Sequence, residues 1–289
     1  MLENASLMAR FASLVYLPEE ELKIKLSQMG YDKFHWIDVE DTQAMIIPPY
    51  QDNQLVICFR GTEPDQLTDV LADLKAWRKP SKEKGLVHYG FVEALDKVFP
   101  TIEYLLESMD ISLEKPVKTV CTGHSLGAAL ATLCAARIDA HELYTFGSPR
   151  VGNRDFVNEL VNDGIKHYRF VNNNDIVTKV PLALMMYKHC GELCYINYHG
   201  NIRKMTPWQR IKDQFRGILR AWQKGEPFDG ARDHSISASE KKLENVCINC
   251  VETGSMTKDL AILVGPSSKY LTTNQFLDVI DGNLKKKLN

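Results

Sequence analysis

The stretch KTVCTGHSLGAALATLC, residues 118–134, places one serine between glycines two positions before and two positions after it. Residues 118–122 are rich in threonine and valine, which favour a strand, and residues 126–137 are rich in alanine and leucine, which favour a helix. Ser125 therefore lies at a strand-to-helix junction with almost no loop. This Gly-x-Ser-x-Gly arrangement predicts a nucleophile elbow, a sharp turn that presents a serine oxygen at the end of a strand. A glycine-rich turn with an incidental serine is the alternative interpretation.

Composition limits the classes of protein to consider. The chain has 289 residues, of which 44% are hydrophobic and 25% are charged, as in an ordinary globular protein. A formal net charge of −2 gives no reason to expect a nucleic acid as partner. The sequence contains no apolar run long enough for a transmembrane segment. Seven cysteines and a start without a signal-peptide pattern favour free thiols and a cytoplasmic location, with export by another route left open.

Strand-like and helical runs alternate along the chain. The strand-like runs are residues 54–61, 118–122, 142–148 and 167–172, and the helical runs are residues 91–109, 126–137 and 153–163. This alternation predicts an α/β fold with a mostly parallel central sheet and helices on both faces. No repeat or linker divides the chain, so we expect one domain over residues 1–289, with residues 245–289 as an extension that matches no pattern.

A serine nucleophile needs a base, and the base needs an orienting acid, in the chain order Ser, Asp, His for this kind of fold. Asp175 follows a strand-like run through three asparagines, where an orienting carboxylate is expected. A turn-capping aspartate is the alternative reading, and Asp163 is a weaker rival. His234, in the loop-like FDGARDHSI, is the best candidate for the base.

The other histidines fit that role less well. His35 and His88 precede the serine, whereas His141 and His167 precede the acid. His189 and His199 follow Asp175 too closely, in a segment that alternates like a hairpin. The side chain of His124, which adjoins Ser125, must leave the turn in another direction.

An oxyanion that forms during acyl transfer needs two N–H donors placed in advance. The elbow supplies the backbone N–H of Leu126. The second donor is expected from Thr62, because a strand ends at Gly61 and Thr62 offers both its N–H and a supporting hydroxyl. An ordinary strand-to-loop turn is the alternative for this position.

Seven segments in this order resemble one family: ICFRGT, VHYGFVEAL, TGHSLGAALATL, LYTFGSPRVGN, RFVNNNDIVTKVP, YKHCGELCYI and DHS. The chain is similar to the fungal-type or class 3 lipases of the α/β-hydrolase superfamily. The resemblance implies an α/β-hydrolase fold with Ser125 as nucleophile, Asp175 as orienting acid and His234 as base. It places the oxyanion hole at Thr62 and Leu126. It also implies structural roles for His88, Gly90, His189 and Glu192.

The resemblance further implies a lid helix over the active site between Thr62 and His88. In DQLTDVLADLKAW, residues 65–77, one helical stripe contains Leu67, Val70, Leu71, Leu74 and Trp77. The alternative is an ordinary amphipathic surface helix. Trp77 lies at the end of this stretch, whereas secreted members often have a tryptophan in mid-lid, which leaves interfacial activation open. By resemblance, Asp73 holds the Thr62 hydroxyl.

The stretch TPWQRIKDQFRGILRAWQKG, residues 206–225, has complete helix signals, with Thr206 and Gln209 as a capping box and Gly225 after the end. One narrow stripe contains Trp208, Ile211, Phe215, Ile218, Leu219 and Trp222, while Arg210, Lys212, Arg216, Arg220 and Lys224 lie outside it. One hypothesis is that Trp208, Phe215 and Trp222 contact an anionic lipid surface. The alternative is that the stripe packs against its own domain.

Four cysteines raise the question of a metal. Cys190, Cys194, Cys247 and Cys250 could in principle form a four-thiolate zinc site. Buried free thiols are the favoured interpretation, so we expect no metal and no cofactor.

Taken together, these residues predict a carboxylic ester hydrolase that cleaves acyl esters of lipids such as triacylglycerol through a serine acyl-enzyme. A phospholipase A1 or a feruloyl-type esterase is an alternative, because the same machinery serves each. A lipase-like domain that binds lipid or a partner without hydrolysis is an alternative of another class. The full set of triad and oxyanion residues argues against this last reading.

Overall fold

The computed structural model describes residues 2–49, 53–62, 78–81, 85–109, 117–197, 199, 202–223 and 233–237. Several predicted features lie outside these residues. They are the lid residues Leu67, Val70, Leu71, Leu74 and Trp77, the Thr62 partner Asp73, the cysteines Cys247 and Cys250, and the extension 245–289. The lid therefore stays a prediction from the sequence.

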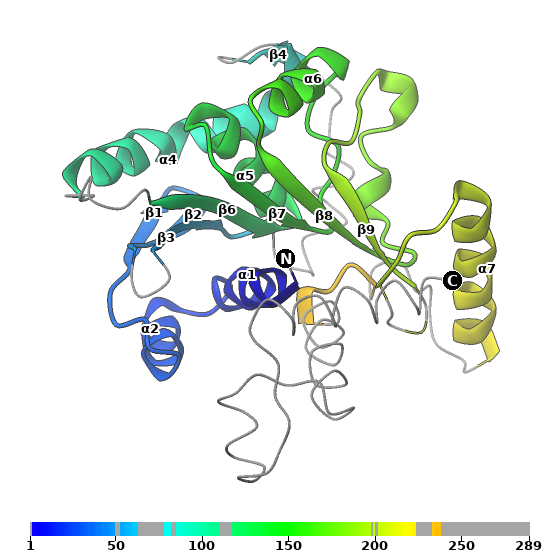
Figure 1. Ribbon diagram of the computed structural model, residues 1–289, viewed down its shortest axis with the longest axis horizontal. Coiled ribbons are helices and arrows are strands. Elements are labelled where there is room, and N and C mark those ends of the chain that lie inside the picture. The colour runs from blue at the N-terminus through cyan, green and yellow to red at the C-terminus, as the bar shows by residue number, and fades with distance from the viewer. Residues whose placement is uncertain are drawn as a thin grey trace, which may run out of the picture.

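The centre of the fold is one sheet of eight strands in the order β1-β2-β3-β6-β7-β8-β9-β10 (Figure 1). The strands are β1 (His35–Val39), β2 (Thr42–Ile47), β3 (Gln54–Phe59), β6 (Lys118–His124), β7 (Glu142–Phe146), β8 (Lys166–Asn172), β9 (Glu192–Ile196) and β10 (Ile202–Arg203). Strands β3, β6, β7, β8 and β9 run parallel, and the outer strands β1, β2 and β10 pair antiparallel. The carboxyl ends of the parallel strands meet at one edge, where Ser125 and the loop of Asp175 follow β6 and β8.

Helices cover both faces of this sheet, as predicted. In Figure 1, α1 (Leu2–Leu14) and α2 (Glu19–Gln28) lie on one face. The opposite face carries α4 (Tyr89–Ser108), α5 (Leu126–Arg137) and α6 (Arg154–Asn162). A small second sheet of β4 (Arg78–Pro80) and β5 (Leu86–His88) precedes α4. The short helices η1 (Val177–Lys179) and η2 (Ala183–Met185) connect β8 to β9.

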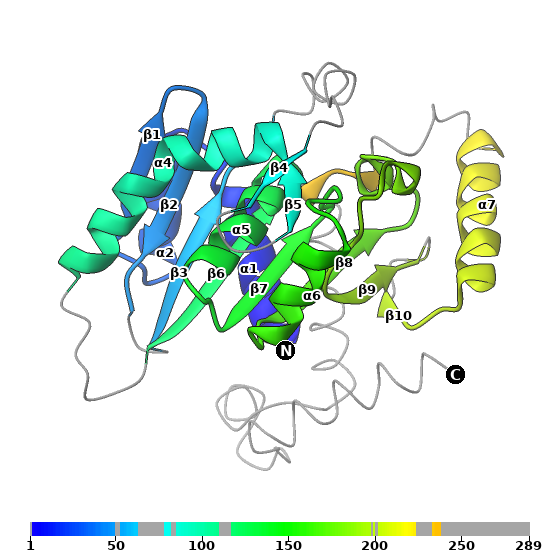
Figure 2. The ribbon, with the colours of Figure 1, turned by 90° about the horizontal axis from the view of Figure 1, so that it is seen from above.

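The last long helix stands apart from these layers. Helix α7 (Pro207–Gln223) lies beyond β9 and β10 at the far end of the molecule (Figure 2). The hairpin predicted upstream of it is confirmed, because β9 pairs antiparallel with β10. No helix in the described part of the chain has the length and apolar composition needed to cross a bilayer.

Two apolar layers form the core because successive residues of a strand point to opposite faces. On β3, Ile57 and Phe59 pack into the layer under α4 and α5, whereas Val56 and Cys58 pack into the layer next to α1 and α2. All four side chains are buried. A continuous apolar run such as that of β3 is expected for a strand covered on both faces.

Candidate active site

Ser125 lies between β6 and α5 with φ 58° and ψ −126°, a left-handed conformation that is rare for a residue with a side chain. Close backbone contacts explain the glycines around it. A Cβ atom on Gly123 would lie 2.4 Å from the carbonyl oxygen of Gly127, and a Cβ atom on Gly127 would lie 2.3 Å from that of Phe59. The local geometry is that of the predicted elbow.

A second backbone segment approaches the serine from the end of β3. A Cβ atom on Gly61 would lie 3.2 Å from the Cβ atom of Ser125. Thr62 follows Gly61 and is half-buried, and Leu126 is the first residue of α5. The two segments that carry the predicted oxyanion donors therefore adjoin Ser125.

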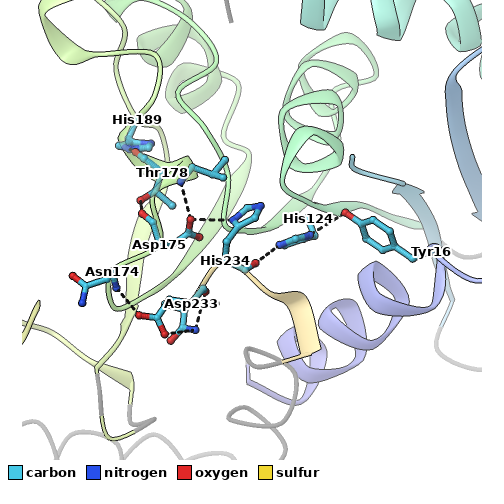
Figure 3. Close-up of polar contacts among 10 residues, drawn as sticks. Tyr16, His124, Asn174, Asp175, Thr178, His189, Asp233 and His234 are labelled. Carbon is cyan, nitrogen blue, oxygen red and sulfur yellow. Dashed lines mark hydrogen bonds and ion pairs between the residues drawn. The ribbon is translucent and has the colours of Figure 1, made fainter. Parts of the chain in front are cut away.

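His234 and Asp175 form a buried pair, drawn in Figure 3. Nδ1 of His234 lies 2.9 Å from Oδ1 of Asp175, and the side chains are 5% and 1% exposed. The same carboxylate oxygen accepts a hydrogen bond from the N–H of Val177 at 2.9 Å. Because a carboxylate oxygen accepts, Nδ1 of His234 is assigned the proton. Among the described residues, Nε2 of His234 is buried and has no hydrogen-bond partner, so it can accept a proton from a hydroxyl.

The end of β7 joins the serine to this pair. The N–H of Ser125 donates to the carbonyl oxygen of Phe146 at 3.0 Å. The next residue, Gly147, has φ +59°, and a Cβ atom there would lie 2.7 Å from Oδ2 of Asp175 and 2.8 Å from Nδ1 of His234. The chain thus passes so close to the acid and the base that a side chain at this position has no space.

Asp233, the residue before His234, is bound to the end of β8. The side-chain amide of Asn172 donates to the carbonyl oxygen of Asp233 at 2.8 Å, and the backbone N–H of Asn174 donates to its Oδ2 at 3.1 Å. All three residues are buried. Asn172 and Asn174, which precede Asp175 in the sequence, therefore fix the segment that carries His234 relative to the acid.

The ring of His124 packs against the ring of His234, with centroids 4.5 Å apart. Its Nε2 lies 2.6 Å from the carbonyl oxygen of His234, and its Nδ1 lies 2.9 Å from the hydroxyl of Tyr16. Burial and the neighbouring His234 hold the pKa of His124 well below its ordinary value, so the ring is neutral. In the tautomer that fits both contacts, Nε2–H donates to the carbonyl and Nδ1 accepts from Tyr16. Figure 3 shows Asp175, His234, His124 and Tyr16 in one row.

Two further histidines brace the turns near the site. Nε2 of His189 lies 2.8 Å from the carbonyl oxygen of Thr178, in the turn that follows Asp175. Nε2 of His167 lies 2.9 Å from Oγ1 of Thr145. Burial lowers the pKa of each histidine to about 3. Both side chains are therefore neutral imidazoles whose hydrogen bonds stabilise the fold near the site.

The described cysteines are buried free thiols: Cys58, Cys121, Cys134, Cys190 and Cys194. Burial raises the pKa of Cys190 to about 11 and that of Cys194 to about 12. Both residues are therefore neutral thiols at ordinary pH in this fold. In the part of the chain that the structure describes, no group of three or more His, Cys, Asp or Glu side chains is arranged to hold a metal ion.

Helix α7 begins with the predicted capping box. The N–H of Thr206 donates to Oε1 of Gln209 at 2.8 Å, and the N–H of Gln209 donates to Oγ1 of Thr206 at 3.3 Å. The hydroxyl of Tyr195 lies 3.0 Å from Oδ2 of Asp213 and 3.0 Å from Oδ1 of Asn173. One buried polar side of the helix is therefore bound to the loop that carries the acid.

The apolar stripe of α7 is open to solvent at its described positions. Trp208, Ile211 and Phe215 are 67%, 53% and 67% exposed, whereas Asp213 is buried. The alternative that this stripe packs against its own domain is wrong for these three residues. The side chain of Trp222 lies outside the described part of the helix.

Comparisons with known proteins agree with this fold. Residues 56–185 match the family model described as lipase (class 3). The chain is 34% identical to a lipase of Rhizomucor miehei over 210 residues, which are 68% of this chain and 55% of the relative. It is 43% identical to a chloroplastic phospholipase A(1) of Arabidopsis thaliana over 152 residues, which are 44% of this chain and 33% of the relative.

Solved structures give the same result. A mono- and diacylglycerol lipase from Aspergillus oryzae aligns with a TM-score of 0.58 at 26% identity, covering 68% of this chain and 80% of that one. The chain belongs to the class 3 lipase family of the α/β-hydrolase superfamily, which confirms the resemblance seen in the sequence. It spans about half the length of the curated Rhizomucor relative.

Four features of the site were not predicted: the glycine at position 147, Tyr16, Asp233 and the place of the His124 ring. Asp233 had a signal, because a carboxylate directly before the candidate base could have been expected to anchor it. The sequence contained no signal for Tyr16, because this residue follows α1 and reaches His124 only when that helix packs on the sheet.

Proposed function

We propose that the protein hydrolyses carboxylic esters of lipids through an acyl-enzyme on Ser125. The observation that carries the proposal is the buried pair of His234 and Asp175. Nε2 of His234 has no hydrogen-bond partner among the described residues, so it is available to accept a proton. Such a pair, close to a serine in a strained elbow, is the arrangement that nucleophilic acyl transfer requires.

The proposed reaction has two halves. Nε2 of His234 takes the proton of the Ser125 hydroxyl as its oxygen attacks the acyl carbonyl, and it then gives that proton to the departing alcohol oxygen. In the second half, His234 removes a proton from water, and the resulting attack on the acyl-enzyme releases the fatty acid and restores Ser125. Asp175 keeps the proton of the imidazole on Nδ1 throughout. The N–H groups of Thr62 and Leu126 are the proposed donors to the oxyanion.

Glycerolipids are the proposed substrate class. The relatives described above include lipases, which makes triacylglycerol the first candidate. The phospholipase A(1) relative and the cationic surroundings of the α7 stripe favour phospholipid as the second. A feruloyl-type ester would use the same catalytic residues, but neither the relatives described above nor the cations near the α7 stripe favour it.

Peripheral contact of α7 with a lipid surface is also proposed. Its exposed stripe of Trp208, Ile211 and Phe215 is accompanied by the exposed cations Lys212 and Arg216. Aromatic residues next to cations suit the boundary between headgroups and acyl chains. The buried Asp213 binds Tyr195 of β9, so a polar contact docks this helix while its apolar stripe stays exposed.

A substrate panel tests the proposal. Emulsified triacylglycerol, phosphatidylcholine vesicles and p-nitrophenyl esters of graded chain length would be incubated with the parent and with Ser125→Ala. We expect hydrolysis of at least one long-chain glycerolipid, and a loss of about 10⁶ in kcat for the variant. Release of fatty acid by the variant at the parental rate would contradict the proposal, and so would an inactive parent that binds the lipids.

A further inference from the structure

The connection between β8 and β9 exposes a short apolar tip. Residues 182–186 read LALMM, and Leu182, Leu184, Met185 and Met186 are 50%, 94%, 44% and 63% exposed. A cluster of large apolar side chains on a surface marks an interaction site, whereas one such residue would need no explanation. None of these residues belongs to the proposed catalytic machinery or to α7.

Both stems of this tip are bound to one short segment after β7. The guanidinium of Arg150 donates to the carbonyl oxygen of Pro181 at 2.8 Å. The N–H of Lys188 donates to the carbonyl oxygen of Gly152 at 2.8 Å. Between the stems the chain forms the single turn η2. The tip is thus ordered before any partner arrives, which lowers the entropy lost on binding.

Each of the two segments that flank the tip carries an exposed lysine. Residues 176–191 contain the exposed Lys179 and Lys188 and no aspartate or glutamate. At the base of the second stem, the guanidinium of Arg78 lies over the ring of the buried Tyr187, 5.8 Å from its centroid. A basic collar around an apolar tip complements a surface that is negative outside and apolar inside. An anionic phospholipid bilayer has this construction.

We infer that residues 182–186 are a membrane-insertion tip, which enters an anionic phospholipid surface while Lys179 and Lys188 contact the headgroups. The inference rests on the proposed function in taking a lipid aggregate as the occupant. The tip follows Asp175 through η1, whose Val177 N–H binds the Asp175 carboxylate. Insertion at this point brings the edge of the sheet that carries the candidate site to the lipid.

Vesicle binding without turnover tests the inference. The full chain with Ser125→Ala would be sedimented with sucrose-loaded vesicles of phosphatidylcholine, with and without phosphatidylglycerol. In this background, Leu184→Asp with Met186→Asp should weaken partitioning into both vesicle types by about tenfold or more, because two apolar side chains no longer leave water. Lys179→Glu with Lys188→Glu should weaken binding to the anionic vesicles alone.

A matched control separates insertion from a general loss of apolar surface. Ile24 on α2 is 58% exposed, and α2 and α7 lie at opposite ends of the molecule in Figures 1 and 2, with β9 and its preceding connection on the α7 side. Ile24→Asp should bind vesicles like its parent. An equal loss for Ile24→Asp, or parental binding by the tip variant, would overturn the inference.

The remaining outcomes are equally decisive. If the tip variant bound vesicles normally but lost self-association in sedimentation velocity, the tip would be assigned to a second copy and the inference would be wrong. With Ser125 restored, the tip variant should hydrolyse soluble short-chain esters at the parental rate. Loss of that activity would show damage to the site instead of lost insertion. An inactive parent would sink the proposed function, while the binding results would still decide the tip.

Discussion

The imidazole of His124 lies against the imidazole of His234 and donates to its backbone carbonyl oxygen at 2.6 Å, while Tyr16 binds the other nitrogen of His124. The residue beside the candidate nucleophile thus supports the segment that carries the candidate base. His124 packs against the ring of His234 and Tyr16 binds His124, but neither exchanges a proton or forms a bond in the proposed reaction, so we regard them as positioning residues.

Replacement of His124 should therefore act through His234. His124→Ala should lower kcat by about 10²-fold, since a shift of about 1 Å in a catalytic group costs this much. His124→Gln, which keeps an N–H donor near the carbonyl, should recover part of the loss. Tyr16→Phe removes the hydroxyl that binds Nδ1 of His124 and should lower kcat by less than His124→Ala, because the contact of His124 with the His234 carbonyl remains. Parental kcat values in both His124→Ala and Tyr16→Phe would contradict the positioning role.

Gly147→Ala should damage the acid–base pair directly. The new methyl group would lie within 3 Å of atoms of both Asp175 and His234, as the distances of 2.7 Å and 2.8 Å show. We expect a fall in kcat of about 10²-fold or more because the two groups must separate. Gly164→Ala is the control, since Gly164 also has a positive φ of +75° but nothing within 4 Å of an added Cβ.

The control should lose about 1 kcal/mol or more of stability through backbone strain but keep its activity. Urea unfolding and initial rates on a soluble ester measure the two effects. Similar activities for Gly147→Ala and Gly164→Ala would mean that close packing at Gly147 does not matter for the site.

His167 should make stability depend on pH in a defined window. Burial, with a smaller effect of the Arg169 charge, lowers its pKa from 6.5 to about 3 in the folded chain. Between about pH 3 and pH 6.5 the unfolded chain binds a proton at His167 that the folded chain does not bind. The free energy of unfolding therefore increases as the pH rises through this range and decreases as the pH falls through it. The slope for one such group reaches about 1.4 kcal/mol per pH unit.

His167→Gln keeps an amide for Thr145 and cannot titrate. The slope of the free energy of unfolding between about pH 6 and pH 4 should therefore fall by about 1.4 kcal/mol per pH unit relative to the parent. Urea titrations at several pH values give this slope. A parental slope in the variant would show that His167 becomes protonated in the fold.

The exposed stripe of α7 should matter for aggregated substrate alone. Trp208→Ala with Phe215→Ala should weaken binding to anionic vesicles and hydrolysis of vesicle lipid, and rates on soluble short-chain esters should stay the same. The free energy of unfolding should change by no more than about 0.5 kcal/mol, since both side chains are mostly exposed. Equal losses on soluble and aggregated esters, together with a lower Tm, would show that the stripe supports the fold.

Local signals explain which parts of the structure were predictable. The elbow around Ser125 and the capping box of Thr206 and Gln209 were visible because each depends on residues close together in the chain. The pairing of Asp175 with His234 followed from the chain order that this fold imposes on nucleophile, acid and base.

The remaining features depend on contacts between distant segments. The fixation of Asp233 by Asn172, and the approach of Tyr16 to His124, arise only when helices and strands are packed together. The exposure of the α7 stripe was also undecided, because an amphipathic pattern does not state whether its apolar side meets protein or lipid. The structure shows that Trp208 and Phe215 are exposed, and their contact with lipid stays a proposal.

The most direct test of the central claim is the site and rate of labelling by a fluorophosphonate, measured by peptide mass spectrometry. We predict one stoichiometric label on the peptide that contains Ser125. It should be absent in Ser125→Ala and form far more slowly in His234→Ala, because the base no longer removes the serine proton. A label on another residue, or labelling of Ser125 at the same rate without His234, would contradict the account.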